Sequence, residues 1–129
     1  MADAVTTQTL IEDARKLILK LTNVSDGTGE AAVTKVDVST FTQNGVALTG
    51  VRIEKIVYST VGMSVLLYWD ATADVLAWAL PADASGCVCF DLPLVNNAGA
   101  GVTGDLQLTT AGHTAGDAYS IVLHLVKVT

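Results

Sequence analysis

The sequence predicts an all-β fold, an antiparallel two-sheet sandwich of about eight strands with a jelly-roll-like order. Apolar and polar residues alternate along most of the chain, and Val, Ile and Thr are abundant, as in half-buried strands. Clusters of Gly, Asn, Asp and Pro separate the alternating runs at strand-sized intervals. The connections are too short for crossover helices, so the strands should pair antiparallel, and eight such strands are typical of a jelly roll.

The length of 129 residues suits one domain. We divide it into an N-terminal arm or edge strand, residues 1–13, and a single β-sandwich domain, residues 14–129. Residues 4–9 would supply a ninth strand if the arm pairs with the sheet.

One segment, residues 8–21, also fits a helix, because Thr9 could cap it and Glu12 stands three positions later. The leucines of 17–21 alternate with other residues, however, and residues with a preference for strands follow. We therefore favour a strand from about Ala14.

The remaining elements follow from the alternation. In residues 51–58 a strict alternation places Val51, Ile53, Lys55 and Val57 on one face. The expected strands are 14–23, 32–40, 47–59, 63–70, 75–80, 87–92, 103–110 and 117–128.

The charge balance excludes several function classes. Seven basic and thirteen acidic residues give a net charge of −6, which argues against nucleic acid and against anionic membranes as partners. No apolar run approaches the roughly 20 residues of a membrane-spanning helix. The start, MADAVTTQTL, is acidic where a secretory signal is basic, so we expect synthesis in a reducing cytoplasm.

The cysteines and histidines show no metal-site spacing. Cys87 and Cys89 would share one face of a strand, with poor geometry for a mutual disulfide. We favour small packing thiols, with redox-sensitive surface thiols and a metal site as the alternatives. His113 is expected in a solvated loop, and His124 on the polar face of a strand.

Candidate catalytic groups are sparse. Asp70 and Asp74 could face each other across a loop, and we interpret this loop as a turn between two strands. The alternatives are a cation site at the loop and a hydrolase that uses Asp70, Asp74 or His113. Residues 26–30 resemble a calcium loop without its ligand spacing, and residues 99–104 match GxGxxG without a following helix. We expect a non-enzymatic protein with no catalytic, cofactor-binding or metal-binding residues.

Several strands carry apolar residues on both faces, as in residues 63–69 and 121–126. A lone sandwich buries only one face of each sheet, so the other face should contact another subunit. The sequence therefore predicts a homo-oligomer, and the expected interface residues are Leu66, Tyr68, Trp69 and Trp78.

Five segments have a familiar combination of loop residues: TNVSDGTGE (22–30), VTKVDVS (33–39), WDATADV (69–75), NNAGAGVTGD (96–105) and GHTAGDAYSIVL (112–123). Together they resemble small virion structural proteins of tailed bacteriophages. The resemblance implies a β-rich virion component, first of all a capsid decoration (cement) protein that binds the major capsid protein as a homotrimer. A neck, tail or fibre-anchoring component is the alternative, and a carbohydrate-binding module using Trp69, Trp78 or Tyr68 is a further one.

Overall fold

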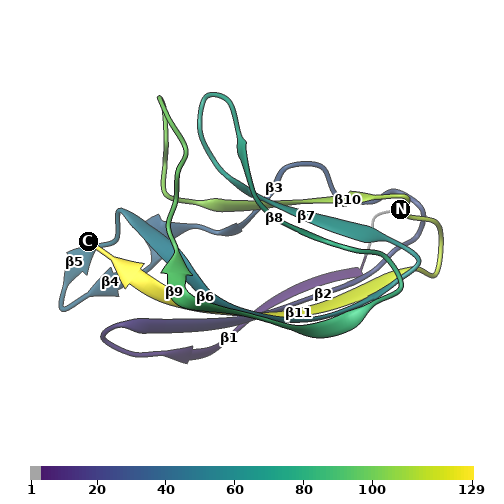
Figure 1. Ribbon diagram of the computed structural model, residues 1–129, viewed down its shortest axis with the longest axis horizontal. Helices are drawn as coiled ribbons and strands as arrows, with labels where there is room; N and C mark the ends of the chain where they lie inside the picture. Colours follow the sequence, from purple (N-terminus) through teal and green to yellow (C-terminus); the bar gives the residue numbers. More distant parts are fainter. Residues whose placement is uncertain (1–3) are drawn as a thin grey trace.

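The computed structural model describes residues 4–129, which form two facing antiparallel sheets (Figure 1). The larger sheet has the strand order β1-β2-β11-β6-β9, and the smaller has the order β3-β10-β7-β8. The larger sheet comprises β1 (Ala4–Glu12), β2 (Lys16–Val24), β11 (Ala118–Val128), β6 (Gly50–Val61) and β9 (Ser85–Leu94). The smaller comprises β3 (Val33–Val36), β10 (Leu106–Ala111), β7 (Ser64–Trp69) and β8 (Val75–Leu80).

This order is that of a jelly roll. Without β1, each sheet has four strands, and the chain passes between the sheets at β2–β3, at β3–β6 by way of the β4–β5 hairpin, and at β6–β7, β8–β9, β9–β10 and β10–β11. The predicted all-β sandwich is therefore confirmed, with its jelly-roll-like order.

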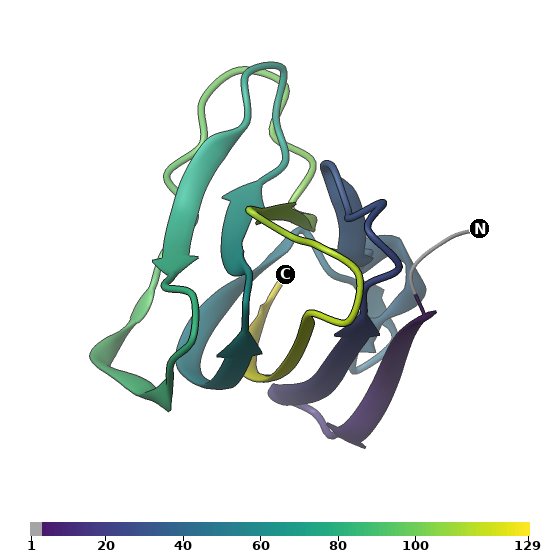
Figure 2. The ribbon, with the colours of Figure 1, turned by 90° about the vertical axis from the view of Figure 1, so that its right-hand side faces the viewer.

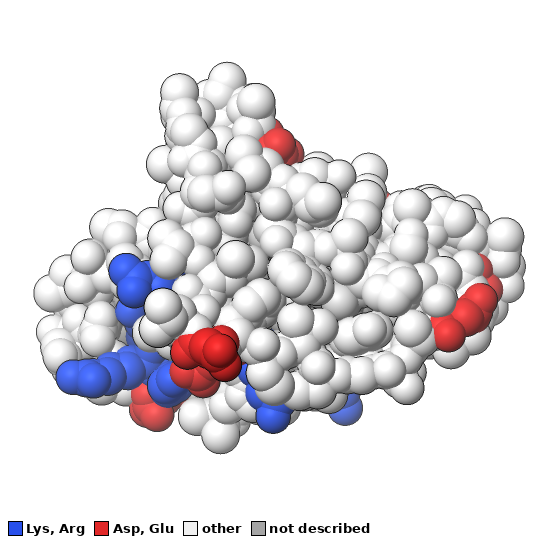
Figure 3. Space-filling view, in the orientation of Figure 1, with Lys and Arg blue, Asp and Glu red and all other residues white. Residues whose placement is uncertain are grey.

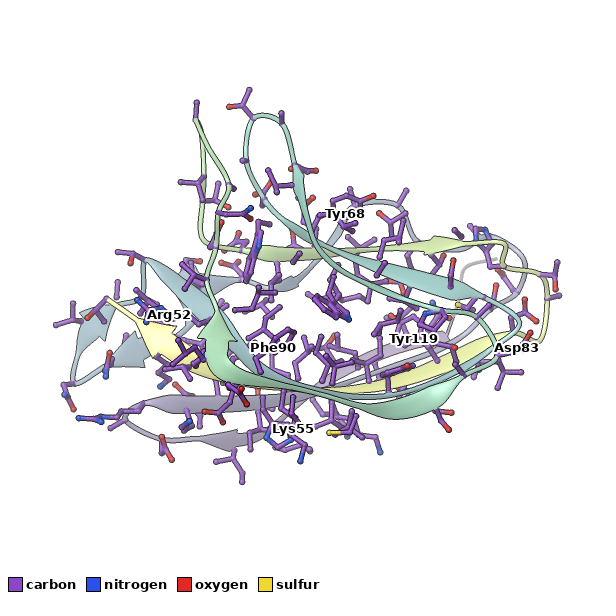
Figure 4. All side chains as sticks on the ribbon, in the orientation of Figure 1. Arg52, Lys55, Tyr68, Asp83, Phe90 and Tyr119 are labelled. Atoms are coloured by element: carbon purple, nitrogen blue, oxygen red, sulfur yellow. The ribbon has the colours of Figure 1, made fainter. Side chains whose placement is uncertain are left out.

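The core lies between the two sheets and is formed by alternate residues of the strands. Burial alternates along β2, β7, β10 and β11, as the sequence pattern predicts. The largest fully buried side chains include Trp69 and Tyr119, and Figure 4 shows Tyr119 between the layers.

The prediction that Val51, Ile53, Lys55 and Val57 share one face of the sheet is wrong for the second half of β6. The register with β11 shifts between His124 and Leu125, opposite residues 53–55, which is a β-bulge. One extra residue in a strand moves all later side chains to the opposite face. Lys55 and Val57 therefore lie outside, and Ile56 is buried in their place.

The chain between β3 and β6 also differs from the prediction. The expected strand 32–40 ends at Val36, and a 3₁₀ turn, η1 (Val38–Thr40), follows under an N-cap from Asp37. A small hairpin, β4 (Thr42–Gln43) and β5 (Val46–Ala47), turns at Asn44-Gly45, which both have positive φ as a type I′ turn requires.

The N-terminal segment is a strand, β1, at one edge of the larger sheet. It pairs in antiparallel register with β2, so the edge-strand prediction holds for Ala4–Glu12 and the helical alternative is wrong. Residues 1–3 of the expected arm lie outside the described residues. Within residues 4–129 there is no helix of the length and hydrophobicity needed to cross a bilayer.

Buried lysines form ion pairs at two places, and the first of them links the two sheets. Lys35 on β3 forms an ion pair of 2.5 Å with Glu30, and both side chains are almost fully buried. Glu30 also accepts hydrogen bonds from Tyr119 Oη at 2.6 Å and Asn23 Nδ2 at 2.7 Å. Elsewhere, buried Lys127 donates to Glu12 Oε2 at 3.0 Å and to the Thr42 carbonyl at 2.8 Å.

Candidate interaction surfaces

The four predicted interface residues separate into three environments. Trp69 is only 1% exposed and belongs to the core, so its assignment to an interface is wrong: its side chain points inward with Val65 and Leu67. Leu66 and Tyr68 alternate with these residues and lie half-buried on the outer face of the smaller sheet, where Figure 4 shows Tyr68.

The outer face of the smaller sheet carries a small apolar patch. Tyr68 lies opposite Leu76 of β8, which is 48% exposed, and Leu66 lies opposite Ala79. On the other side Tyr68 faces the half-buried Gln107 of β10. We call Leu66, Tyr68 and Leu76 the small-sheet patch.

Trp78 lies on the opposite side of the smaller sheet. It pairs across the strands with the buried Leu67 and therefore faces the core side. Its ring meets Phe90 of β9 edge-on, with centroids 5.1 Å apart and an interplanar angle of 89°. The pair spans the two sheets at their β8 and β9 edges and leaves Trp78 37% exposed.

The outer face of the larger sheet is mixed apolar and basic. Three cross-strand rows run from β2 through β11 to β6, because residues opposite each other in the ladder share a face. The rows are Lys16–Val126–Arg52, Ile18–His124–Lys55 and Lys20–Val122–Val57. We call these nine residues the basic face.

Positive charge is confined to this side of the protein. Of the seven Lys and Arg residues, Lys35 and Lys127 are buried in the ion pairs described above. Four others lie on the basic face, and Arg15 lies in the turn between β1 and β2. Figure 3 shows the blue side chains along the lower and left margins, with none on the projecting loops.

Four loops away from the basic face carry only negative charge. Loops 70–74, 81–84, 95–105 and 112–117 contain aspartates but no Lys or Arg. Figure 2 shows the β7–β8 and β9–β10 loops projecting side by side beyond the smaller sheet. These loops are therefore acidic, whereas the basic face keeps Lys20, Arg52 and Lys55 beside the Lys16–Glu54 pair. This charge separation favours an oriented approach to a charged partner.

His124 lies at the centre of the basic face. The side chain lies on the outer face of β11, as predicted, between Ile18 and Lys55. Burial, and then the neighbouring Lys55 ammonium, lower its pKa. The basic face therefore gains no charge from His124 at neutral pH.

β1 exposes every side chain from Val5 to Glu12. Leu10 and Ile11 are each 51% exposed, and Val5 is 40% exposed. Only one edge of β1 is paired, with β2, so its other edge has free backbone donors and acceptors.

The candidate catalytic residues do not come together. Asp70 accepts hydrogen bonds from Thr103 Oγ1 at 2.7 Å and Gln107 Nε2 at 3.0 Å, and it thereby holds the β9–β10 loop. Asp74 accepts from the Ala71 amide, as expected for a turn. His113 contacts Thr110 Oγ1 at 3.2 Å, near the other end of β10.

His113 is half-buried, whereas a solvated loop was predicted. Its ring fills the space where a side chain at Gly29 would lie. Residues 26–30 form a turn, since the Asp26 carboxylate accepts from the Thr28 amide. Within residues 4–129, no three His, Cys, Asp or Glu side chains are arranged to hold a metal ion.

The two cysteines are exposed on the outer face of β9, so the favoured prediction of packing thiols is wrong. β9 forms one edge of the larger sheet and pairs only with β6. Its cysteines lie opposite Val57 and Lys55, whose side chains point outward after the β-bulge in β6. The thiols consequently lie outside the core.

A cleft of about 210 Å³ opens where the β9–β10 loop meets the start of β6 and the end of β11. Val51, Val95, Ala98 and Val102 line it, and Arg52 is its one charged lining residue. This lining offers no acid–base pair.

Sequence reasoning missed the basic face. Alternation does place Lys16 and Lys20 opposite the buried leucines of β2, but the bulge in β6 hides that Lys55 joins them. A comparison with models of known protein families finds no match, and a search of curated proteins finds none.

Proposed function

We propose that this chain is a non-enzymatic virion structural protein, a capsid decoration (cement) protein of a tailed phage. The observation that carries the proposal is β1, a nine-residue edge strand paired antiparallel with β2, whose side chains from Val5 to Glu12 are all exposed. A strand that covers no core and keeps one edge free is suited to contact another chain.

The basic face supports the same proposal. Its valines and Ile18 offer apolar area beside Lys20, Arg52 and Lys55, which complements an acidic protein surface. The major capsid protein is the partner we assign to it. The acidic loops would then point away from the shell and keep neighbouring particles apart by charge repulsion.

The small-sheet patch supplies a surface for self-association. It is uncharged and lies on the side away from the basic face. Copies could therefore associate through Leu66, Tyr68 and Leu76 while the basic face binds the shell, as a homotrimer would require.

The carbohydrate-binding alternative finds no support in the positions of the aromatic residues. A sugar-stacking platform needs rings on one exposed surface. Trp69 is in the core, and Tyr68 and Trp78 lie on opposite sides of the smaller sheet.

The test is co-sedimentation of the purified chain with empty capsids of the cognate phage. We expect binding to saturate in a whole-number ratio to the major capsid protein. The double variant Lys20→Gln/Lys55→Gln should bind at least tenfold more weakly, because each charge-assisted contact contributes about 1 kcal/mol or more. The control, Ala73→Glu/Ala82→Glu, changes the net charge equally on exposed loops and should bind normally.

Binding of only a few copies per particle would contradict the decoration role and favour the neck or tail alternative. Equal loss of binding in both double variants would show that net charge matters and that the basic face does not.

A further inference from the structure

Two thiols lie side by side at the free edge of the larger sheet. Cys87 and Cys89 occupy alternate positions of β9 and point to the same outer face, opposite Val57 and Lys55 of β6. Both are exposed, and their sulfur atoms are 3.1 Å apart.

This geometry does not suit a disulfide. Residues i and i+2 of an extended strand have Cα atoms about 6.5 Å apart, near the upper limit for a disulfide, whose S–S bond is about 2.05 Å. Bond formation would require β9 to bend away from its ladder with β6.

A single atom bridging both sulfurs fits better. With bonds of about 2.3 Å, as in zinc thiolates, sulfurs 3.1 Å apart subtend an angle of about 85° at the bridging atom. A linear thiolate complex at that bond length needs sulfurs about 4.6 Å apart, so a pyramidal centre with angles near 90° is favoured.

We propose that Cys87 and Cys89 form a bidentate dithiol site for trivalent arsenicals. In the reaction with an arsenoso compound, R–As=O, two As–S bonds form while both S–H bonds and the As=O bond break. The two protons leave with the oxygen as water, and arsenic remains trivalent. The organic substituent occupies the third position, so the protein needs to supply only two ligands.

The surroundings of the thiols agree with this role. The hydrogen bond with Cys87, followed by burial, raises the pKa of Cys89, which favours the thiol form of Cys89, the form whose proton leaves with the arsenical oxygen. Lys55, opposite Cys89, acts in the other direction. The site lies at the edge of the sheet opposite β1, so it stands independently of the proposed function.

The test uses the reduced full-length chain and phenylarsine oxide, with adducts read by intact-mass spectrometry in the presence of excess glutathione. We expect one arsenical per chain, removable by a dithiol such as dimercaptopropanol and resistant to glutathione. Cys87→Ser and Cys89→Ser should each need about 100-fold more arsenical for half-labelling, because the second thiol no longer acts at high effective concentration.

Labelling of either single variant at the concentration that labels the unsubstituted chain would overturn the proposal. So would an adduct that glutathione removes as readily as the dithiol does. Because both thiols are exposed, the variants should melt like the unsubstituted chain. Prior alkylation of the unsubstituted chain with iodoacetamide should abolish the adduct without any substitution.

Discussion

At the scale of single residues, the ion pair between Lys35 and Glu30 joins the smaller sheet to the larger. Its side chains are almost fully buried, and Glu30 also holds Tyr119. Lys35→Met would leave a buried carboxylate without its counter-ion, so we expect the free energy of unfolding to fall by about 3–5 kcal/mol in urea denaturation.

Two further variants test whether the loss of stability arises from the buried, unpaired charge. Lys16→Met removes the partly exposed pair with Glu54 and should cost no more than about 1 kcal/mol. Lys35→Met combined with Glu30→Gln should recover most of the loss, because no charge is then left unpaired. Similar losses for Lys35→Met and Lys16→Met would contradict this account.

Asp105 gives a second prediction at this scale, concerning pH. Burial raises its pKa, the nearby Asp37 and Asp70 add to the effect, and the hydrogen bond from the Val38 amide opposes it. The folded state therefore binds the proton more tightly than the unfolded state, and this contribution to stability is lost as the pH rises through the folded pKa.

Asp105→Asn keeps an acceptor for Val38 and removes the charge. We expect a higher melting temperature than that of the unsubstituted chain at pH 7, and no difference below about pH 3, where both side chains are largely neutral in the folded and the unfolded state. Asp91→Asn, on an exposed position of β9, is the control. A difference that is the same at both pH values would rule out titration as its cause.

At the scale of elements, strand existence could be predicted from alternation, whereas strand faces and ends could not. β2 and β11 follow period two throughout. In β6 the bulge opposite His124–Leu125 adds a residue, and no local signal marks it, because the bulge depends on the register of the neighbouring strand. The same dependence on a partner ends β3 early at Val36.

The N-terminal strand carries the prediction at this scale. Deleting residues 1–9 should weaken capsid binding and leave the sandwich folded, because the side chains from Val5 to Thr9 are exposed and Glu12 still pairs with Lys127. Circular dichroism should show the strand spectrum retained, and co-sedimentation should show weaker binding than for the full chain. Equal capsid affinity would exclude β1 as a contact.

At the scale of the whole molecule, the interaction surface was only partly predictable. Apolar residues on both faces of β7 led correctly to Leu66 and Tyr68 as outward residues, but equally to Trp69, which is in the core. Trp78 faces inward because β8 is bulged at its pairing with β7. The basic face emerges only when three strands distant in sequence are aligned.

The last prediction concerns assembly. If the small-sheet patch joins copies, light scattering at micromolar concentration should give about three times the mass of one 13.4 kDa chain. Tyr68→Ser/Leu76→Ser should shift the mass toward that of the monomer, because Leu76 is exposed and Tyr68 half-buried on the outer face. The control, Val61→Ser on an exposed position of β6, should remain trimeric.

A chain that is monomeric both in solution and on the capsid would contradict the proposal that the small-sheet patch joins copies. A monomer that becomes trimeric only on the shell would instead mean that the two surfaces act together. Binding through the basic face would then raise the local concentration of copies until the small-sheet patch, too weak in solution, associates. In that case Tyr68→Ser/Leu76→Ser would make the capsid-binding curve less steep, whereas Lys20→Gln/Lys55→Gln would lower the affinity for the capsid. Titrating capsids with each variant would therefore distinguish the two surfaces.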